Sequence, residues 1–350
     1  MKTLSVAARS QSYDVKIASG ILDAVGAAVK TYTDAERCIV VSGTNVFPLY
    51  GERTLASLRK EGLIAESIVF PAGEGTKSFR FYERLLNFIA EHHLTRSDCL
   101  IALGGGVTGD LTGFAAATWQ RGIPYIQIPT TLLAAVDSSV GGKTAINITA
   151  GKNQVGAFWQ PAAVLCDPDT LKTLPEREVR AGFAEVIKYA CLGNADLFDG
   201  LQRRSHPVEE LIEICIRMKA EIVAEDEYDT GRRRLLNFGH TIGHAIEQRS
   251  GYMLLHGEAV SVGMAMICRA AVQMKYMDEA SKEAVISLLC EYGLPTEPQY
   301  PADELYDLIL ADKKVSSGKL HLIVPRAIGW CADVPVDPEQ MKEWLLAAYE

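Results

Sequence analysis

The first half of the chain alternates short apolar runs with segments of helical periodicity. Five short runs predict strands: CIVVSG (38–43), SIVFP (67–71), CLIALGGG (99–106), PYIQIPTT (124–131) and AVLCDP (163–168). Between them, two longer segments repeat apolar residues every three to four positions and predict amphipathic helices, over residues 47–62 and 78–94. Strands that alternate with helices predict a parallel sheet covered on both faces.

The second half of the chain has a mostly helical pattern. Six segments predict helices: EVRAGFAEVIKYACL (178–192), PVEELIEICIRMKAEIVAE (207–225), NFGHTIGHAIEQ (237–248), GEAVSVGMAMICRAAVQMKYM (257–277), SKEAVISLLCEYG (281–293) and PEQMKEWLLAAY (338–349). One strand candidate, KLHLIVP (319–325), interrupts this series. The pattern changes between Pro168 and Pro175. We therefore expect an α/β domain over residues 1–170 and a mostly α-helical domain over residues 171–350.

Composition narrows the possible functions. A chain of 350 residues with 48% hydrophobic content is long enough for about two domains. The net charge of -9 argues against nucleic acid as a partner, because nucleic-acid-binding surfaces are normally basic. No run is long and apolar enough to span a membrane, and the first residues contain no apolar segment of the signal-peptide type. Eight scattered cysteines without a CxxC pair indicate a reducing compartment, so we expect a cytoplasmic protein.

The segment LGGGVTGDLTGF carries the first candidate site. Gly104, Gly106 and Gly109 follow a predicted strand with the spacing G-x-G-x-x-G, and we expect a helix to begin near Asp110. Such a turn brings backbone N–H groups close to a pyrophosphate. The acidic residue expected about twenty positions later is missing, and Asp110 would repel a phosphate at the helix start. A tight strand-to-helix turn is the alternative, but we favour a dinucleotide site that is not of the usual Rossmann type.

Residues 128–158 form the densest polar stretch of the chain. Its hydroxyl, amide and charged side chains stand among glycines: Thr130, Thr131, Asp137, Ser138, Ser139, Lys143, Lys152 and Asn153. Lysines next to glycine-rich backbone are suited to binding a phosphate or a carboxylate. A single lysine is more often a solvated surface charge. The close packing of glycines and hydroxyls favours an anion site here.

A helix with apolar residues on all sides carries Glu185 and Lys188, three positions apart. This pair lies on one helix face and could be an ordinary surface ion pair. The apolar neighbours predict instead that the helix is buried. A buried glutamate needs a cation or a proton as its partner.

Three histidines provide possible metal ligands for such a cation. His240 and His244 are four positions apart and project from one helix face, a spacing that suits zinc, and His256 follows. Two histidines with one glutamate are a common catalytic zinc set. Spacing selects His240, His244 and a carboxylate, and it leaves open whether His256 replaces one of them. A packed, non-ligating histidine pair is the alternative.

Two basic runs complete the candidate chemistry. Residues 232–234 are three consecutive arginines just before the histidine helix, and Lys313 and Lys314 lie in a predicted turn. Basic runs are usually solvated faces. Next to a metal-binding helix, they could bind an anionic substrate.

Six long motifs together resemble those of the 3-dehydroquinate synthase family of sugar phosphate cyclases, in the same order and over essentially the whole chain. They are GGGVTGDLTGF, QIPTTLLAAVDSSVGGKTAIN, GKNQVGAFWQP, AEVIKYA, LLNFGHTIGHAIE and HGEAVSVGM. The resemblance implies an N-terminal NAD-binding α/β domain, a helical metal-binding C-terminal domain and a homodimer. It implies conversion of the sugar phosphate 3-deoxy-D-arabino-heptulosonate 7-phosphate into 3-dehydroquinate and phosphate, with NAD regenerated in each turnover.

The resemblance also assigns residues. It implies that Glu185, His240 and His256 bind the metal, zinc or alternatively cobalt, and that His244 serves the substrate or a proton transfer. The substrate-site positions that it implies are Asp137, Lys143, Lys152, Asn153, Lys188, Arg233, Asn237, His244 and Lys314, with Arg121 supplied by the second subunit. The NAD-site positions that it implies are Asn45, Glu74, Lys77, Gly105, Gly106, Val107, Asp110, Thr130, Thr131, Asp137, Lys143, Lys152, Thr173 and Leu174.

The chain departs from the family pattern at three positions. Gly43 stands where an acidic residue is common, Asp229 where glutamate is usual, and Trp159 where histidine or tyrosine is commoner. One alternative function is another sugar phosphate cyclase, such as one that acts on sedoheptulose 7-phosphate. Another is a metal-dependent polyol dehydrogenase. The basic positions favour a phosphorylated substrate, and Arg233 with Asn237 favours one that carries a carboxylate.

Overall fold

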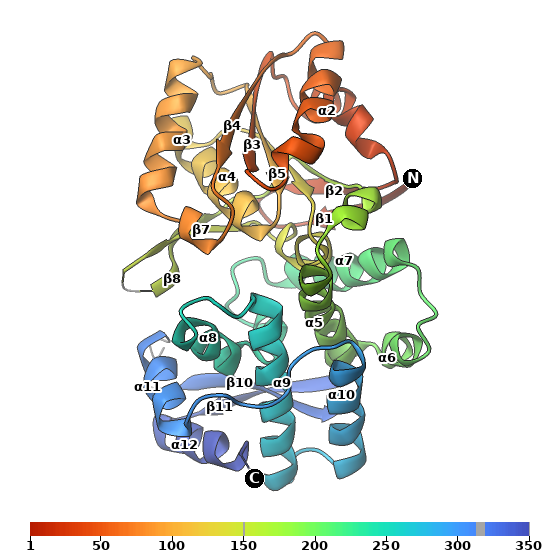
Figure 1. Cartoon of the computed structure of the whole chain (residues 1–350), viewed down its shortest axis with the longest axis vertical. Coiled ribbons are helices and arrows are strands. Elements are labelled where there is room, and N and C mark those ends of the chain that lie inside the picture. The colour runs from red at the N-terminus through yellow and green to blue at the C-terminus, as the bar shows by residue number, and fades with distance from the viewer. Residues whose placement is uncertain (150, 313–318, 350) are drawn as a thin grey trace. The chain divides into compact units, whose positions relative to one another are not determined.

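The computed structural model describes residues 1–149, 151–312 and 319–349, and its contacts divide the chain into two units (Figure 1). The first unit comprises Met1–Pro175 and Val208–Tyr228, and the second comprises Glu176–Pro207 and Asp229–Glu350. The helix over residues 208–225 therefore groups with the α/β part of the chain, although it lies among the helical segments in sequence.

The first unit is built on a seven-stranded sheet in the order β1-β2-β9-β6-β5-β3-β4. Its strands are β1 (Lys2–Ala7), β2 (Ser12–Ile17), β3 (Arg37–Gly43), β4 (Ile64–Phe70), β5 (Cys99–Gly104), β6 (Tyr125–Pro129) and β9 (Ala163–Cys166). The pair β1–β2 is antiparallel, and the other pairings of this sheet are parallel. The expected parallel sheet is confirmed, and the N-terminal hairpin is an addition that the sequence analysis did not predict.

Helices cover both faces of this sheet, as its continuous apolar strands require. In β3, Val40 packs into the cluster that contains Leu58 of α2, whereas Val41 packs into the cluster that contains Leu85 of α3. Successive strand residues point to opposite faces, so each face receives every second residue. Figure 1 shows α2 and α3 on opposite sides of the sheet. The helices of this unit are α1 (Val25–Tyr32), α2 (Phe47–Lys60), α3 (Phe79–Glu91), α4 (Gly106–Thr118) and α7 (Val208–Glu225).

A second, two-stranded sheet carries the polar stretch of the first unit. Strands β7 (Lys143–Ile148) and β8 (Gly151–Phe158) pair antiparallel, and β7 packs on α4. The sequence analysis did not predict these strands, because their exposed polar residues and glycines obscure the alternation of a strand. They matter for function because they hold Lys143, Lys152 and Asn153.

The start of α4 corrects one expectation. The helix begins at Gly106, four residues before Asp110. Asp110 therefore lies in the second turn, and its carboxylate is 2.5 Å from the ammonium of Lys77. The expected repulsion between Asp110 and a phosphate at the helix start does not apply, because the first turn contains no acidic residue.

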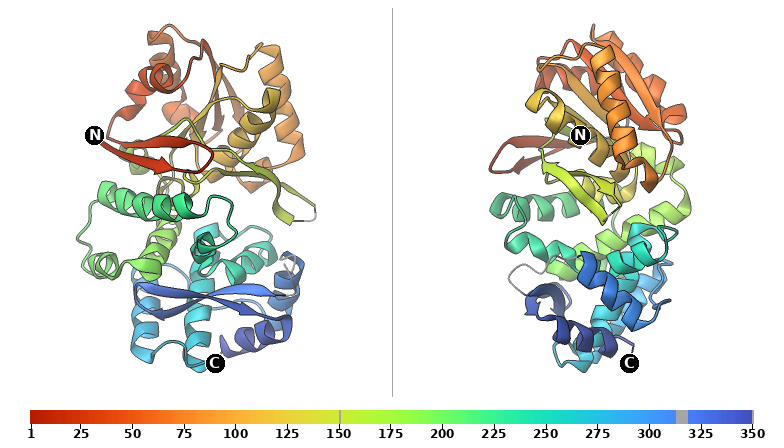
Figure 2. Two further views of the ribbon diagram at one scale, coloured as in Figure 1. Left: turned by 180° about the vertical axis from the view of Figure 1, so that it is seen from behind. Right: turned by 90° about the vertical axis from the view of Figure 1, so that its left-hand side faces the viewer.

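The second unit is organised around α9, which is buried on almost all sides. This helix packs against α5, α8, α10, α12 and strand β10. The elements of the unit are α5 (Glu176–Gly193), α6 (Ala195–Gln202), α8 (His240–Arg249), α9 (His256–Gln273), α10 (Glu279–Glu291), α11 (Ala302–Asp312), β10 (Leu320–Ala327), β11 (Trp330–Val336) and α12 (Pro338–Ala347). The predicted strand is confirmed as β10, and it forms a hairpin with β11, blue in Figure 2. The helical character expected for this part is confirmed.

Glycines let α9 approach two neighbouring helices at backbone distance. A Cβ atom on Gly257 would lie 1.9 Å from the carbonyl oxygen of Ala181 in α5. A Cβ atom on Gly263 would lie 2.0 Å from the carbonyl oxygen of Gly239, the N-cap residue of α8. Only glycine fits at these two positions.

Among the described residues, no helix combines the length and the apolar character needed to cross a lipid bilayer.

Candidate active site

Three helices of the second unit bring together the expected metal ligands. Glu185 lies in α5, His240 is the first residue of α8, and His256 is the first residue of α9. Oε1 of Glu185 is 3.6 Å from Nε2 of His240 and 3.3 Å from Nε2 of His256. Ligands bound tetrahedrally at about 2.0–2.2 Å from a zinc ion lie about 3.3–3.6 Å apart. Both histidine nitrogens therefore lie at such a spacing from Oε1 of Glu185.

The ring nitrogens of both histidines are oriented for ligation. Nδ1 of His240 is 3.0 Å from the carbonyl oxygen of Phe238, so this nitrogen donates and Nε2 keeps its lone pair. Nδ1 of His256 is 3.2 Å from Oε2 of Glu247, which has the same effect. Burial lowers the pKa of His240 to about 4, so this ring is neutral at pH 7. Neutral imidazole is the form that binds metals.

Glu185 shows why this cluster suits a cation. Its side chain is completely buried, and so is that of Lys188, whose ammonium is 2.6 Å from Oε2. Oε1 instead faces the two imidazole nitrogens. Two lone pairs and a carboxylate oxygen converge there, an arrangement that a divalent metal stabilises. The residues present therefore fit a metal such as zinc or cobalt.

His244 belongs to the same cluster. Its ring centroid is 5.4 Å from that of His240 and 5.7 Å from that of His256. The ligand nitrogens of the three histidines lie within 4.8 Å of one another. The geometry thus also brings together a set of three histidines. Burial and the two short distances make Glu185 the candidate anionic ligand.

Five charged and amide side chains form a polar cluster in the first unit. Lys77, only 3% exposed, is at its centre, and its ammonium is 2.5 Å from both Asp110 Oδ2 and Asn153 Oδ1. Oε1 of Glu74 is 3.7 Å from the ammonium of Lys152 and 3.8 Å from that of Lys77. Burial raises the pKa of Asp110, although the Lys77 charge opposes this shift. The cluster joins the loop after β4, helix α4 and strand β8.

The sequence analysis missed Asn147, which links two parts of this cluster. Its Nδ2 donates to Oε1 of Glu74 at 2.8 Å, and its Oδ1 accepts from the backbone N–H of Asn153 at 2.8 Å. Asn153 has a φ of 54°, in the left-handed region. A polar residue inside the GKTAIN motif was the available signal, but sequence alone gave no reason to prefer it to its neighbours.

Lys219 was also missed. This lysine of α7 is only 6% exposed, and its ammonium is 2.5 Å from Oδ1 of Asp137 and 2.7 Å from the Asp137 carbonyl oxygen. Asp137 lies in a short π-helical turn, Ala134–Ser138. The signal in the sequence was a lysine inside the apolar stripe of a helix, which indicates a buried cation with an anionic partner.

Two family models decide the relationship of the chain. The model described as 3-dehydroquinate synthase N-terminal matches residues 67–181, and the one described as 3-dehydroquinate synthase C-terminal matches residues 182–315. The chain belongs to the 3-dehydroquinate synthase family. A 3-dehydroquinate synthase from Desulforamulus reducens is 43% identical over 344 residues, covering 94% of this chain and 95% of the relative.

Solved structures of related sugar phosphate cyclases have the same fold. A 2-deoxy-scyllo-inosose synthase, complexed with carbaglucose-6-phosphate, NAD+ and Co2+, superposes with a TM-score of 0.88 at 28% identity, covering 98% of this chain and 99% of that chain. A 2-epi-5-epi-valiolone synthase from Streptomyces hygroscopicus subsp. jinggangensis 5008, with NAD+ and Zn2+ bound, has a TM-score of 0.88 at 29% identity, and 98% of each chain is covered. Both relatives hold NAD+ and a divalent metal.

Most NAD positions expected from the 3-dehydroquinate synthase family follow the carboxyl ends of parallel strands. The segments that follow β3, β4, β5, β6 and β9, including the start of α4, carry Asn45, Glu74, Lys77, Gly105, Gly106, Val107, Asp110, Thr130, Thr131, Thr173 and Leu174. The order of the strands reverses between β3 and β5, which are neighbours in the sheet. From β3 the chain continues to β4 at one edge, whereas from β5 it continues to β6 in the opposite direction. Nucleotides bind at such reversal points, so the sheet supports these positions as a group.

Local contacts in these turns explain two sequence features. Gly105 caps α4 and lies against Thr131, because a Cβ atom on Gly105 would be 2.9 Å from the Thr131 methyl carbon. A Cβ atom on Gly43 would be 2.7 Å from Oδ1 of Asn45. The departure at Gly43 thus leaves space that the Asn45 side chain uses. Trp159 is another departure from the family pattern. Its indole N–H donates a hydrogen bond to the carbonyl oxygen of Ile123.

The remaining substrate positions lie in several elements. Arg233, 1% exposed, and Asn237 belong to the short 3-10 segment Arg232–Asn237. Lys143 begins β7 with an exposed side chain, and Arg121 ends a short turn after α4 with a φ of 68°. Lys314 lies outside the described residues.

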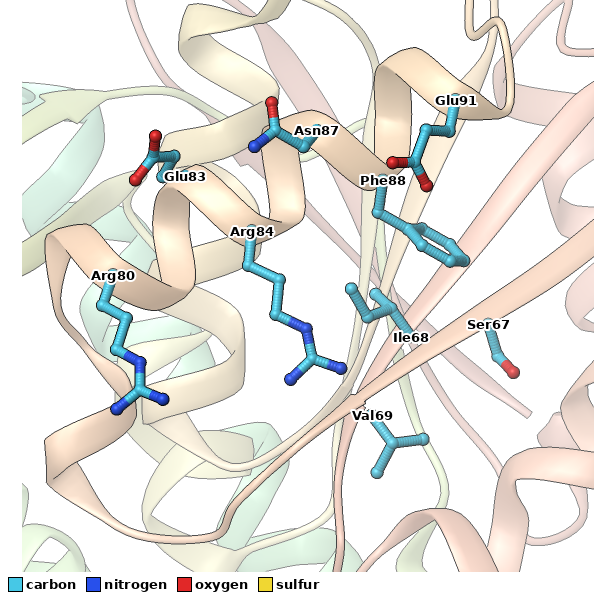
Figure 3. A pocket seen from close by; sticks show the side chains of 9 residues that line it. All are labelled: Ser67, Ile68, Val69, Arg80, Glu83, Arg84, Asn87, Phe88 and Glu91. Atoms are coloured by element: carbon cyan, nitrogen blue, oxygen red, sulfur yellow. The ribbon is translucent and has the colours of Figure 1, made fainter.

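A groove of about 750 Å³ lies elsewhere in the first unit (Figure 3). Its lining comes from β4 and α3: Ser67, Ile68, Val69, Arg80, Glu83, Arg84, Asn87, Phe88 and Glu91. No residue expected to bind substrate, cofactor or metal is among them. The groove is therefore not a candidate for the active site.

The contact at Gly257 predicts how helix packing controls metal binding. In Gly257→Ala, the new methyl group would press on the Ala181 carbonyl and move the start of α9 away from α5, which separates His256 from Glu185. We expect metal affinity to fall at least about tenfold, and overpacking to lower stability by about 1–3 kcal/mol. Chelator competition and thermal unfolding measure the two effects. Gly75→Ala is the control, because nothing lies within 4 Å of its Cβ position. Wild-type metal affinity in Gly257→Ala would contradict the prediction.

Proposed function

We propose that the chain converts 3-deoxy-D-arabino-heptulosonate 7-phosphate into 3-dehydroquinate and phosphate, as a carbon–oxygen lyase. The observation that carries this proposal is the 43% identity to a 3-dehydroquinate synthase over nearly the whole chain. Two features support it: the Glu185–His240–His256 cluster, and the polar cluster that contains Lys77 and Lys152.

The proposed reaction explains the need for two cofactors. Oxidation of a substrate hydroxyl to a ketone acidifies the adjacent C–H bond and allows phosphate to leave by β-elimination. Reduction of the ketone and an intramolecular aldol step then close the product ring. NAD, when bound, takes up the hydride and returns it, so the overall reaction involves no net redox change. A divalent metal, which we propose to be zinc, polarises the reacting oxygen when bound.

We assign the side chains by their charge and surroundings. Lys152 and Asn153 bind the phosphate group, because a half-buried ammonium and an amide are next to each other in β8. Lys143, Arg233 and Asn237 are assigned to the carboxylate and the ring hydroxyls. His244, beside the metal ligands, is assigned to proton transfer or phosphate binding. Lys188 keeps the Glu185 carboxylate ionised and oriented.

Two further parts of the proposal concern assembly and location. We propose a homodimer in which Arg121 completes the phosphate site of the second subunit. We also propose that the enzyme works in the cytoplasm. Seven of the eight cysteines are buried, which is consistent with a reducing compartment.

A single assay tests the proposed reaction. Purified protein with NAD and a divalent metal should release phosphate from the heptulosonate phosphate without a matching accumulation of NADH. Phosphate is measured colorimetrically and NADH by its absorbance. One NADH per phosphate would indicate the dehydrogenase alternative. Turnover of sedoheptulose 7-phosphate in preference to the heptulosonate phosphate would indicate another cyclase.

Alanine substitutions test the proposed ligand set. Glu185→Ala, His240→Ala and His256→Ala each remove one of the converging ligands and should abolish tight metal binding, whereas His244→Ala should retain it. Metal content after dialysis against a weak chelator measures the difference. Loss of metal in His244→Ala together with retention in His256→Ala would refute the assignment.

Subunit complementation tests the proposed shared site. Lys152→Ala should weaken binding of a phosphonate substrate analogue by about ten- to a hundredfold, because a charge-assisted contact is worth about 1.5–3 kcal/mol. In mixed dimers of Arg121→Ala and Lys152→Ala subunits, sharing places both lesions in one site and none in the other. About half the wild-type activity should then return. Activity no higher than that of the two parents would place Arg121 in the site of its own subunit.

A further inference from the structure

Glu247 is a buried carboxylate to which the ligand assignments give no role. It is 5% exposed and lies in α8, seven residues after His240 and three after His244. These spacings place the three side chains along one helix face. Oε2 of Glu247 is 3.2 Å from Nδ1 of His256, the first residue of α9. Burial of a carboxylate is costly, so a glutamate at this position calls for a reason other than packing.

The hydrogen bond to Glu247 fixes which nitrogen of His256 carries the proton. An ionised carboxylate can only accept, so Nδ1 must donate. In the neutral ring, Nε2 then keeps its lone pair, and it lies 3.3 Å from Oε1 of Glu185. Glu247 therefore acts on the side of the ring opposite to the ligand cluster.

His240 shows the same arrangement with a different acceptor. Its Nδ1 faces the backbone carbonyl oxygen of Phe238 at 3.0 Å, and its Nε2 faces Glu185. One ring is thus held by a backbone carbonyl just before α8, which no substitution of a side chain removes. The other ring is held by a side chain from a different helix, because Glu247 belongs to α8 whereas His256 begins α9.

We propose that Glu247 is a positioning residue that sets the tautomer and the ring orientation of His256 for metal binding. This inference rests on the metal site of the proposed function. A carboxylate behind a ligating imidazole also makes the ring a stronger ligand, and loss of such a partner typically lowers metal affinity by about 10–100-fold.

Two substitutions separate the hydrogen bond from the charge. Glu247→Gln keeps an oxygen acceptor for Nδ1–H but removes the charge, so the tautomer should persist and the metal dissociation constant should rise by about tenfold. Glu247→Leu removes the acceptor, so both tautomers should be populated and the dissociation constant should rise by up to about a hundredfold. Zn2+ and Co2+ affinities are measured by chelator competition. Tautomers are measured in the metal-free protein by long-range 1H–15N correlation of the histidine rings.

Glu227→Gln is the matched control. Glu227 is also 5% exposed, but it accepts hydrogen bonds from Ser10 and Gln160 in the first unit. Its substitution removes a buried carboxylate of the first unit that accepts from Ser10 and Gln160, so metal affinity and the histidine tautomers should stay as in the wild type.

The variant Glu185→Ala distinguishes a failure of the role proposed for Glu247 from a failure of the proposed metal site. If Glu185→Ala binds metal as tightly as the wild type, the metal site itself is wrong. If Glu185→Ala loses the metal while Glu247→Leu keeps wild-type affinity and the Nδ1–H tautomer, only the role of Glu247 is overturned. Should Glu247→Leu fail to fold, Glu247→Gln decides, and wild-type metal affinity in that variant overturns the proposal.

Discussion

Backbone contact between helices is the constraint on which the candidate metal centre depends. Each expected ligand comes from a different helix, and sub-ångström placement of three side chains requires helices that cannot slide. Gly257 and Gly263 provide this, because they bring the backbone of α9 against Ala181 of α5 and Gly239 of α8. Dispersion contacts between close-packed backbones are numerous and leave little freedom for displacement. The glycines in the HGEAVSVGM motif are thus part of the ligand geometry, although they contain no ligand atoms.

The cationic side chains of the first unit face a different problem, since the chain as a whole carries a net charge of -9. Carboxylates hold these positive charges in place. Asp110 binds the ammonium of Lys77, and Asp137 binds that of Lys219. The free-energy cost of removing these charges from water arises when the protein folds. It therefore does not arise again when an anionic ligand binds to such a cluster. Specific recognition of a phosphate is therefore compatible with an acidic protein.

Elements with a clear hydrophobic periodicity could be predicted from the sequence. Candidate site residues could be predicted where they lie in long motifs that resemble those of the family. Buried strands such as residues 38–43 and long apolar helices were predicted because their patterns are determined by burial. The strands at 143–158 were not, because a half-exposed hairpin rich in glycine has no clear alternation. The ligand choice between His244 and His256 could not come from spacing, since the distance from His256 to α8 and α5 depends on tertiary packing. Asn147 and Lys219 were missed for the same reason: their partners are distant in sequence. The individual site assignments remain predictions.

The grouping of α7 has a consequence for how this chain can be divided. The polypeptide leaves the first unit after Pro175, returns to it at Val208 and leaves it again after Tyr228. A fragment that ended at residue 175 would therefore lack part of its own unit. It would expose the apolar surface that α7 covers on β1 and would leave Asp137 without Lys219. Neither unit corresponds to one continuous gene segment, so recombination at the apparent domain border would exchange incomplete parts. Over evolutionary time, this chain path favours the joint inheritance of the two units.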